Sequence, residues 1–392
     1  MQFHQDEWII TFAEMDAIIE KAGLQRGSLD VLPPLVTASG LTAPLTDGQE
    51  QQPLSEGENH RQLLEACLSV LANPKRVVRL HYTVADSTIS RSILATSDVL
   101  PGIWVSLAGS TDPFRLSLRS DPELRFLVHD ILAAETAVHP TQIGCDFSTA
   151  AALVLLAALD QARRSWLVSL LRHLEPVSLF SLQDIKDRLA ESAIEDFRWV
   201  LPLVEKLLPI PVRELFVSED PRSALLELVE AGLIEPVNEE ATVYDWTEAG
   251  RVLADGDRQA ASRLVLSQSF HLPEGEIAHD VVSLIRTPLD LFLFLMSGAE
   301  ASMSTLLPGD LAALLEQIFA SPLSVTVPAA LSTEPDASMA AGGRQEPEII
   351  SGQTVHSATE VTRVVQKFCT TCGAQLTEGA KFCRQCGTKL ST

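Results

Sequence analysis

The chain has 392 residues, of which 46% are apolar and 21% are charged, with 29 Lys and Arg against 52 Asp and Glu. At roughly 100–200 residues per domain this length predicts two to three domains, and the composition excludes a chain that is disordered throughout. The net charge of −23 argues against a general nucleic-acid binder and against docking on anionic lipid, because both need a basic surface.

The N-terminal sequence MQFHQDEWII has neither the basic start nor the apolar core of a signal peptide. The longest apolar run, residues 150–159, is too short for a membrane-spanning helix, which needs about 20 residues. We therefore expect a cytoplasmic protein with reduced thiols and no membrane insertion.

Residues 1–147 are predicted to form a first α+β repeat. Apolar periods and capping residues place its elements in chain order. They are a helix at 12–21, a Ser-capped helix at 55–71, strands at 76–83, 103–107 and 114–118, and a helix that begins at Asp121-Pro122. A long helix at 148–175 follows, and it is apolar on most faces, which predicts a buried connecting helix.

Residues 176–320 are predicted to form a second α+β repeat. Its expected elements are a helix at 182–192, a Thr-capped helix at 247–254, strands at 263–267, 281–285 and 291–296, and a helix that begins at Pro308-Gly309. Within it, residues 224–253 are typical of the late part of a winged helix, with a helix, a Gly turn and short strands. Glu227 and Glu230 on that helix favour protein interaction over DNA reading.

The two repeats align with each other. Residues 114–133 match residues 301–320 without a gap at an offset of 187, and the same offset pairs residues 76–78 with 263–265. This pattern predicts an internal duplication. The expected fold class is α+β, with two pseudo-repeated subdomains that each carry a small antiparallel sheet and several helices.

Residues 321–365 are rich in Pro, Ala, Ser, Gly and acids, and they have no sustained apolar period, so they predict a flexible linker. The charge is divided near the same boundary. Residues 360–392 carry five basic and two acidic residues, a net of +3, so the other 359 residues carry −26.

Residues 366–392 contain four of the six cysteines, in the repeated sequences KFCTTCGAQL and KFCRQCGTKL. Each Cys-x-x-Cys turn presents two sulfurs, and two such turns supply the four thiolates of a tetrahedral zinc site. The predicted ligands are Cys369, Cys372, Cys383 and Cys386. Because four thiolates leave no open position, the one expected Zn²⁺ is structural rather than catalytic.

This segment resembles the short zinc-ribbon family found at the ends of many bacterial and archaeal proteins. All four cysteines match, as do Gly373 and Gly387, which follow the second cysteine of each pair. The resemblance implies a metal-stabilised module that contacts a protein or a nucleic acid. Since only the ribbon is basic, nucleic-acid binding is expected through the ribbon alone.

Catalytic motifs are absent from the sequence: it has no Walker A loop, no Gly-x-Gly-x-x-Gly, no His-Glu-x-x-His and no Gly-x-Ser-x-Gly. His129-Asp130 is expected on a solvated helix face and His279-Asp280 in a surface loop before a strand, and His81 has no Cys or His at ligand spacing. Cys67 lies among apolar residues, which predicts a buried hydrophobe. We therefore expect no enzymatic activity and assign no catalytic or organic-cofactor residues. One alternative remains an enzyme whose site is assembled from residues that are distant in the sequence.

Residues 1–320, which we call the body, also resemble the EspG-type cytosolic chaperones of type VII secretion. The residues that carry the resemblance are TFAEMDAIIEKAGL at 11–24, LLEACLSVLANPKRVVRL at 63–80 and FRLSLRSDPELRFLVHDILA at 114–133. The resemblance implies two pseudo-symmetric α+β halves that shield a secreted helical substrate. The sequence thus favours a non-enzymatic protein-binding adaptor, and the alternative is a transcription-associated protein whose ribbon or winged-helix-like segment touches nucleic acid.

Overall fold

The computed structural model describes residues 2–4, 7–31, 54–84, 88–109, 113–136, 141–272 and 275–319. The chain divides into two units, Met1–Ala329 and Ala330–Thr392, and all described residues belong to the first. The predicted linker at 321–365 and the predicted ribbon at 366–392 therefore lie outside the described residues.

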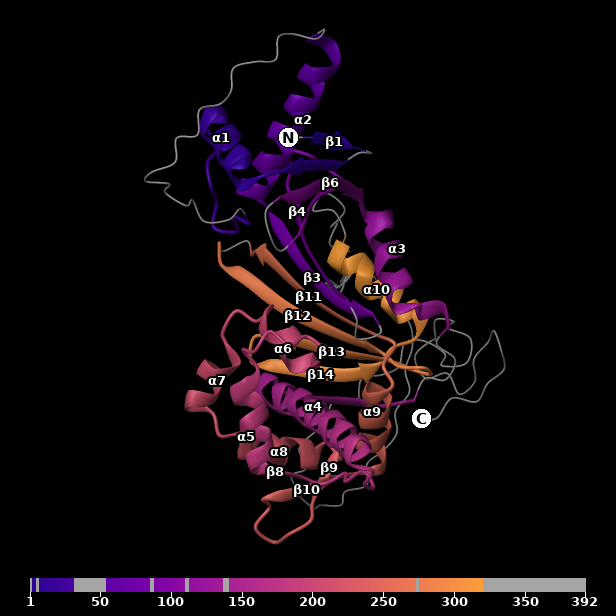
Figure 1. Ribbon diagram of the computed structural model, residues 1–392. Helices are drawn as coiled ribbons and strands as arrows, with labels where there is room; N and C mark the ends of the chain where they lie inside the picture. The colour runs from indigo at the N-terminus through magenta and orange to yellow at the C-terminus, as the bar shows by residue number, and fades with distance from the viewer. Residues whose placement is uncertain are drawn as a thin grey trace, which may run out of the picture. The chain divides into compact units, whose positions relative to one another are not determined.

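The described residues form helices that pack on a large antiparallel sheet, which confirms the predicted α+β class (Figure 1). The sheet has 11 strands in the order β1-β2-β6-β5-β4-β3-β11-β12-β13-β14-β7. Its strands are β1 (Gln2–His4), β2 (Glu7–Ile10), β3 (Arg76–Val84), β4 (Thr88–Thr96), β5 (Ile103–Ala108), β6 (Phe114–Ser120), β7 (Gly144–Ser148), β11 (Ser262–His271), β12 (Ile277–Arg286), β13 (Leu291–Ser297) and β14 (Glu300–Thr305).

The two small sheets expected from the sequence are instead one continuous sheet. Strands β3 and β11 pair in antiparallel fashion along nine residue pairs, from Arg76–Phe270 to Val84–Ser262, and so connect the two halves. The expectation of separate sheets was wrong. In two separate sheets β3 and β11 would each be an edge strand, whereas here each has a hydrogen-bonded strand on both sides. A paired interior strand also avoids the exposed polar row of a sheet edge.

Strand order is the same in both directions from this central pair. It runs β3-β4-β5-β6-β2 on one side and β11-β12-β13-β14-β7 on the other. The closing helices α3 (Asp121–Leu132) and α10 (Pro308–Phe319) begin and end 187 residues apart, which is the offset of the sequence alignment. This order does not establish a duplication of the sequence, which stays a prediction. Strand β7 pairs with β14, so the sheet of the second half begins before the predicted boundary at residue 147.

Three core clusters cover the two faces of the sheet. Side chains alternate between the two faces along each strand, so one strand contributes residues to the core cluster on each face. On one face α3 and α10 pack side by side over both halves, around Leu80, Leu264 and Leu315 (Figure 1). On the other face, α1 (Phe12–Ala22) and α2 (Leu54–Ala72) cover the first half, whereas α4 (Thr149–Arg172) and α9 (Glu248–Arg258) belong to the core of the second.

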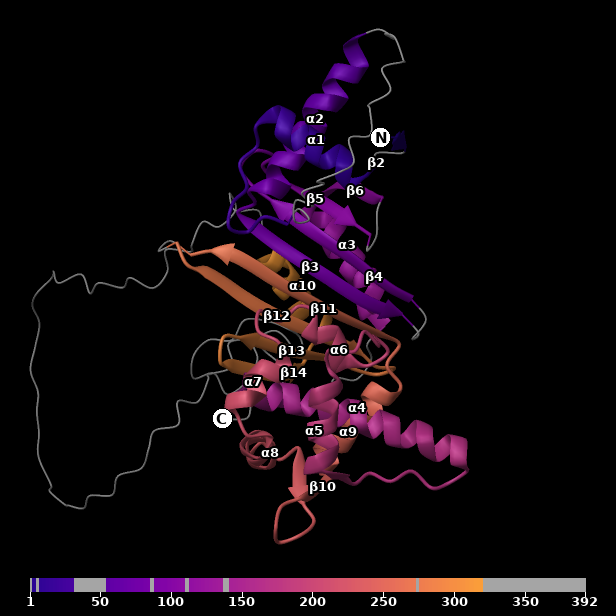
Figure 2. The same cartoon turned by 60° about the vertical axis from the view of Figure 1, so that its left-hand side comes forward.

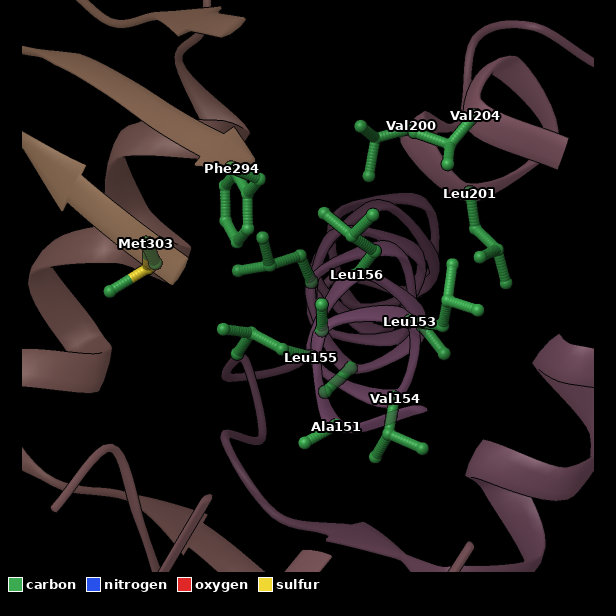
Figure 3. Packing of buried hydrophobic residues seen from close by; sticks show 14 of the residues in the cluster. Ala151, Leu153, Val154, Leu155, Leu156, Val200, Leu201, Val204, Phe294 and Met303 are labelled. Atoms are coloured by element: carbon green, nitrogen blue, oxygen red, sulfur yellow. The ribbon is translucent and has the colours of Figure 1, made fainter. Parts of the chain in front are cut away.

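Helix α4 is the centre of the second core. Figure 3 shows its side chains directed toward Phe294 and Met303 of the sheet on one side and toward α6 (Val200–Glu205) on the other. Ser148 caps its start by accepting a hydrogen bond from the Ala151 amide. The residues from Ala150 to Asp160 are all buried.

The prediction that the whole segment 148–175 is buried was wrong for its second part. Leu170 is 50% exposed, Leu171 is 82% exposed and Leu174 is 61% exposed. The end of α4 extends past the helices that cover its start (Figure 2). Apolar periodicity alone does not distinguish a side chain that faces a core from one on a projecting helix end.

The winged-helix-like segment has the predicted order of helix, Gly turn and strands. Helix α8 (Pro221–Glu230) ends before Gly232, whose φ of 70° turns the chain into β9 (Ile234–Pro236) and β10 (Val243–Trp246). With β8 (Phe180–Ser181) these form a second sheet in the order β8-β10-β9. The remaining elements are α5 (Leu182–Glu191), α7 (Val212–Ser218) and the 3₁₀ turn Ala134–Thr136.

Helix α8 packs against α4 and β7 within the protein. The Glu227 carboxylate on this helix accepts hydrogen bonds from the Ser148 amide at 2.8 Å and the Ser148 hydroxyl at 3.0 Å. Glu227 thus helps to fix the start of α4. The position of α8 therefore favours a structural role for this segment.

Candidate functional site

The predicted zinc ligands Cys369, Cys372, Cys383 and Cys386 lie outside the described residues. Their chemistry fits zinc, since two Cys-x-x-Cys pairs provide four thiolates and no competing donor is needed. Among the described residues no group of three or more His, Cys, Asp or Glu side chains could hold a metal ion. Any site in the body must therefore be sought in its clefts and buried charges.

The two remaining cysteines are not set up as reactive thiols. Cys67 in α2 is buried, as predicted, and burial raises the pKa of its thiol to about 12. Cys145 in β7 is half-buried, and burial followed by the charge of Asp146 raises its thiol pKa to about 11. Both thiols are protonated at neutral pH, whereas nucleophilic cysteines have lowered pKa values.

A cleft of about 1140 Å³ lies on the sheet face that carries α3. Strands β4, β5 and β6 form its floor, α3 forms one wall, and the loop between α5 and α6 reaches its edge. The residues that line it are Tyr82, Ser90, Arg91, Ser92, Leu94, Ser106, Ala108, Gly109, Pro113, Arg115, Arg119, Glu123, Leu124, Phe126, Leu127, Asp130, Glu195 and Phe197.

The α3 wall of the cleft presents apolar side chains to solvent. Phe126 is 72% exposed and Leu127 is 38% exposed, although both lie on a helix whose other face is firmly packed through Leu124 and Val128. Large exposed apolar residues beside polar ones are typical of a surface that binds another molecule. The cleft thus combines a rigid floor with an apolar wall.

The charged groups of the cleft are already held by neighbours. Glu123 accepts hydrogen bonds from the amide and hydroxyl of Ser120 at 2.7 and 3.0 Å, and these bonds lower the pKa of its carboxyl. Arg119 forms an ion pair with Glu7 at 3.5 Å. The hydrogen bond and charge of Lys206, 2.7 Å from Glu195, lower the pKa of the Glu195 carboxyl. The lowered pKa values of Glu123 and Glu195 are the opposite of the raised pKa that a general acid needs.

The cleft is open at the end where β4 continues past β5. Strand β5 pairs only with Ser92–Ala95 of β4, so residues 88–91 extend beyond it. At this end the guanidinium of Arg91 lies over the ring of Phe197, 4.5 Å from its centroid. The sequence prediction missed the cleft because it missed β4. The signal was available in the alternation of ISRSILAT at 89–96.

The histidines singled out in the sequence do not meet in a site. His279 bonds to the Ser269 hydroxyl and to the Leu207 carbonyl, both at 2.8 Å, and so ties the chain after α6 to the sheet. His129 lies on α3 and His81 on β3. The three histidines thus lie on three different elements.

A buried carboxylate, Asp160 in α4, fixes α6 to the core. It accepts hydrogen bonds from the amides of Val200 and Leu201 at 2.8 and 2.9 Å, at the start of α6. Nearby Asp257 is paired with Arg263 at 2.9 Å, and both are buried. Complete burial, and then the charge of Asp257, raise the pKa of Asp160 to about 7.

The comparisons with known proteins point to two different parts of the chain. Residues 368–390 match the model of a zinc-ribbon domain, which confirms the predicted resemblance. No curated protein matches the chain. The body is similar to the Mycobacterium tuberculosis type VII secretion chaperone EspG5, solved in complex with a PE25–PPE41 dimer, at 9% identity and a TM-score of 0.38 over 80% of this chain and 96% of that chain. None of the described helices is long and apolar enough to cross a membrane.

Titration of Asp160 is predicted to make stability fall as the pH rises. Because its folded pKa of about 7 exceeds the unfolded value of 3.8, the folded state binds the extra proton between these pH values. The contribution to the unfolding free energy should decline across this window by roughly 3–4 kcal/mol, at about 1.4 kcal/mol per pKa unit. Denaturant unfolding at pH 4 to 7 should give a flatter dependence for Asp160→Asn than for the wild type.

The control for this experiment is Asp255→Asn, at an exposed carboxylate of α9 that pairs with Arg258. It should keep the slope of the wild type. Equal slopes for Asp160→Asn and the wild type would contradict the assignment.

Proposed function

We propose that this chain is a non-enzymatic cytoplasmic adaptor whose body binds a segment of a protein partner in the cleft beneath α3. The observation that carries the proposal is the exposure of Phe126 and Leu127 on the wall of a cleft of about 1140 Å³. Exposed aromatic and aliphatic side chains next to a rigid surface are what a protein partner uses as anchors.

A protein segment fits the cleft better than a small metabolite or substrate does. Sites for small molecules enclose most of the ligand, whereas this cleft is open along the extended end of β4. Its carboxylates at Glu123 and Glu195 are bound to a helix start and to Lys206 respectively. They are therefore poorly placed for proton transfer, which supports a binding role.

The C-terminal ribbon supplies a second, metal-stabilised contact in this proposal. Cys369, Cys372, Cys383 and Cys386 would hold one structural Zn²⁺. A module of this size has too small a core to fold alone, so metal binding supplies most of its folding free energy. Joined to the body by the predicted linker at 321–365, the ribbon would raise the avidity for a partner that carries both epitopes.

The alternative function is nucleic-acid binding, and it applies to the ribbon alone. The net charge of +3 over residues 360–392 supports it. The packing of α8 against α4, with Glu227 on the start of that helix, disfavours the winged-helix-like segment as a DNA reader. A role as a secretion chaperone is a narrower form of the protein-binding proposal and rests on the sequence resemblance to EspG-type chaperones.

A photo-crosslinking amino acid placed at Phe126 should join the full-length chain to a discrete protein partner in the native cytoplasm. The matched control is the same amino acid at Val217 of α7, which is 86% exposed and does not line the cleft. Adding Leu127→Asp should remove the adduct formed at position 126, because a carboxylate would enter the apolar wall. Equal adducts from both positions, or adducts with nucleic acid only, would contradict the proposal.

Zinc content tests the ribbon separately. Native mass spectrometry should find one zinc per wild-type chain, and Cys383→Ser should lose it at a chelator concentration that the wild type withstands, since one of four thiolates is gone. Cys145→Ser, which changes a half-buried thiol of the body, should retain the zinc. A full zinc equivalent in Cys383→Ser under the same conditions would show that the ligand set is wrong.

A further inference from the structure

Three basic side chains share one face of the central sheet. Arg79 and His81 are two residues apart on β3, and His81 pairs directly with Arg91 of β4. Because side chains alternate along a strand, all three point to the same side. This side is opposite to α3 and α10, and here α6 packs against β11.

None of these three side chains forms an ion pair with a carboxylate among the described residues, although Glu195 lies near enough for the charge of Arg91, after the hydrogen bond and charge of Lys206, to help lower the pKa of its carboxyl. The guanidinium of Arg79 forms no hydrogen bond or ion pair there, and that of Arg91 lies over the Phe197 ring. The Nδ1 atom of His81 is buried without a hydrogen-bond partner. Lys206, the fourth cation in the neighbourhood, is paired with Glu195. In a chain with a net charge of −23, two neighbouring arginines without an ion pair are unexpected.

Burial makes the missing counter-charge costly. Removal from water lowers the pKa of the Arg79 guanidinium. His81 has a pKa lowered to about 4, first by burial and then by the charges of Arg91, Arg79 and Lys206. These side chains are partly buried, and a partly buried charge without a partner is less favourable than one in water. An anion that enters the site relieves that cost.

Strand β11 adds a further donor to the same place. Ser267 pairs with Arg79 across the sheet, and its buried hydroxyl has no hydrogen-bond partner among the described residues. Val265 lies opposite His81 and adds an apolar boundary. The nearby His279 is held by Ser269 and the Leu207 carbonyl, so it does not neutralise the group.

We propose that Arg79, His81, Arg91 and Ser267 form a binding site for an oxyanion, either a carboxylate or a phosphate. Guanidinium groups bind both with paired hydrogen bonds, and the Ser267 hydroxyl and a protonated His81 add single donors. Arg91 also lines the cleft, so the proposed site adjoins the cleft at this residue. The site does not depend on the proposed protein partner, since a free ion can fill it.

Binding should be coupled to proton uptake by His81. After burial, the positive charges that lower its pKa are those of Arg91 on β4, Arg79 on its own strand and Lys206 after α6, and the Glu195 carboxylate lies beside Arg91 and Lys206. An anion offsets their repulsion, so His81 becomes protonated near its ordinary pKa. The anion therefore binds more tightly as the pH falls from the ordinary histidine pKa of about 6.5 toward the lowered value of about 4.

The first experiment measures thermal stability of the full-length chain in inorganic phosphate against sodium chloride at equal ionic strength. Phosphate should raise the melting temperature of the wild type to a saturating value. Arg79→Met should lose this response, whereas Arg213→Met, at an exposed arginine of α7 with the same change in charge, should keep it. Equal responses in Arg79→Met and the wild type, or no effect of phosphate beyond that of chloride, would overturn the proposal.

A second experiment does not require a variant at Arg79 to fold. The His81 resonance, assigned with His81→Gln, should titrate near pH 4 in chloride and at least about two units higher in saturating phosphate, near the ordinary histidine value. An unchanged His81 titration would overturn the proposal. Parallel titrations with acetate and with an acidic peptide identify the source, because a phosphate site responds to phosphate alone and a carboxylate site to all three.

Discussion

The pairing of β3 with β11 is the interaction on which the rest of the structure depends. It turns two hairpin series into one sheet of 11 strands and buries both strands between hydrogen-bonded neighbours. It also lets α3 and α10 share a single core across both halves. Without this pairing each half would expose a long apolar edge, which soluble proteins avoid.

The same pairing positions the two candidate sites on opposite faces. Even-numbered residues of β4, such as Ser92 and Leu94, face α3 and form the floor of the cleft. Odd-numbered residues, including Arg91 with Arg79 and His81 of β3, face the side where α6 covers β11. Arg91 lies in the part of β4 that extends beyond β5, so it adjoins both the cleft and the basic side chains of β3. One strand extension thus brings an apolar wall and a cationic group close together.

Much of the fold was predictable from local patterns, because capped helices and alternating strands are encoded within short windows. The first residues of α3 and α10 and the α+β class are examples. The single sheet was not predictable, since nothing local in Arg76–Val84 specifies Ser262–His271 as its partner. The cleft was not predicted because the sequence prediction did not include β4, which forms part of its floor. The group of basic side chains could not be predicted either, because it depends on the register between β3 and β4. The zinc ligands stay a prediction, because they lie outside the described residues and rest on their spacing alone.

The most direct test of this account is native-state hydrogen exchange of the amides in β3 and β11. If the two halves form one sheet, these amides should exchange only through global unfolding, with the same free energy in both strands and the same denaturant dependence. If the β3 amides exchange at a much lower free energy than the β11 amides, the first half opens by itself. That result would contradict a sheet held together by this central pair.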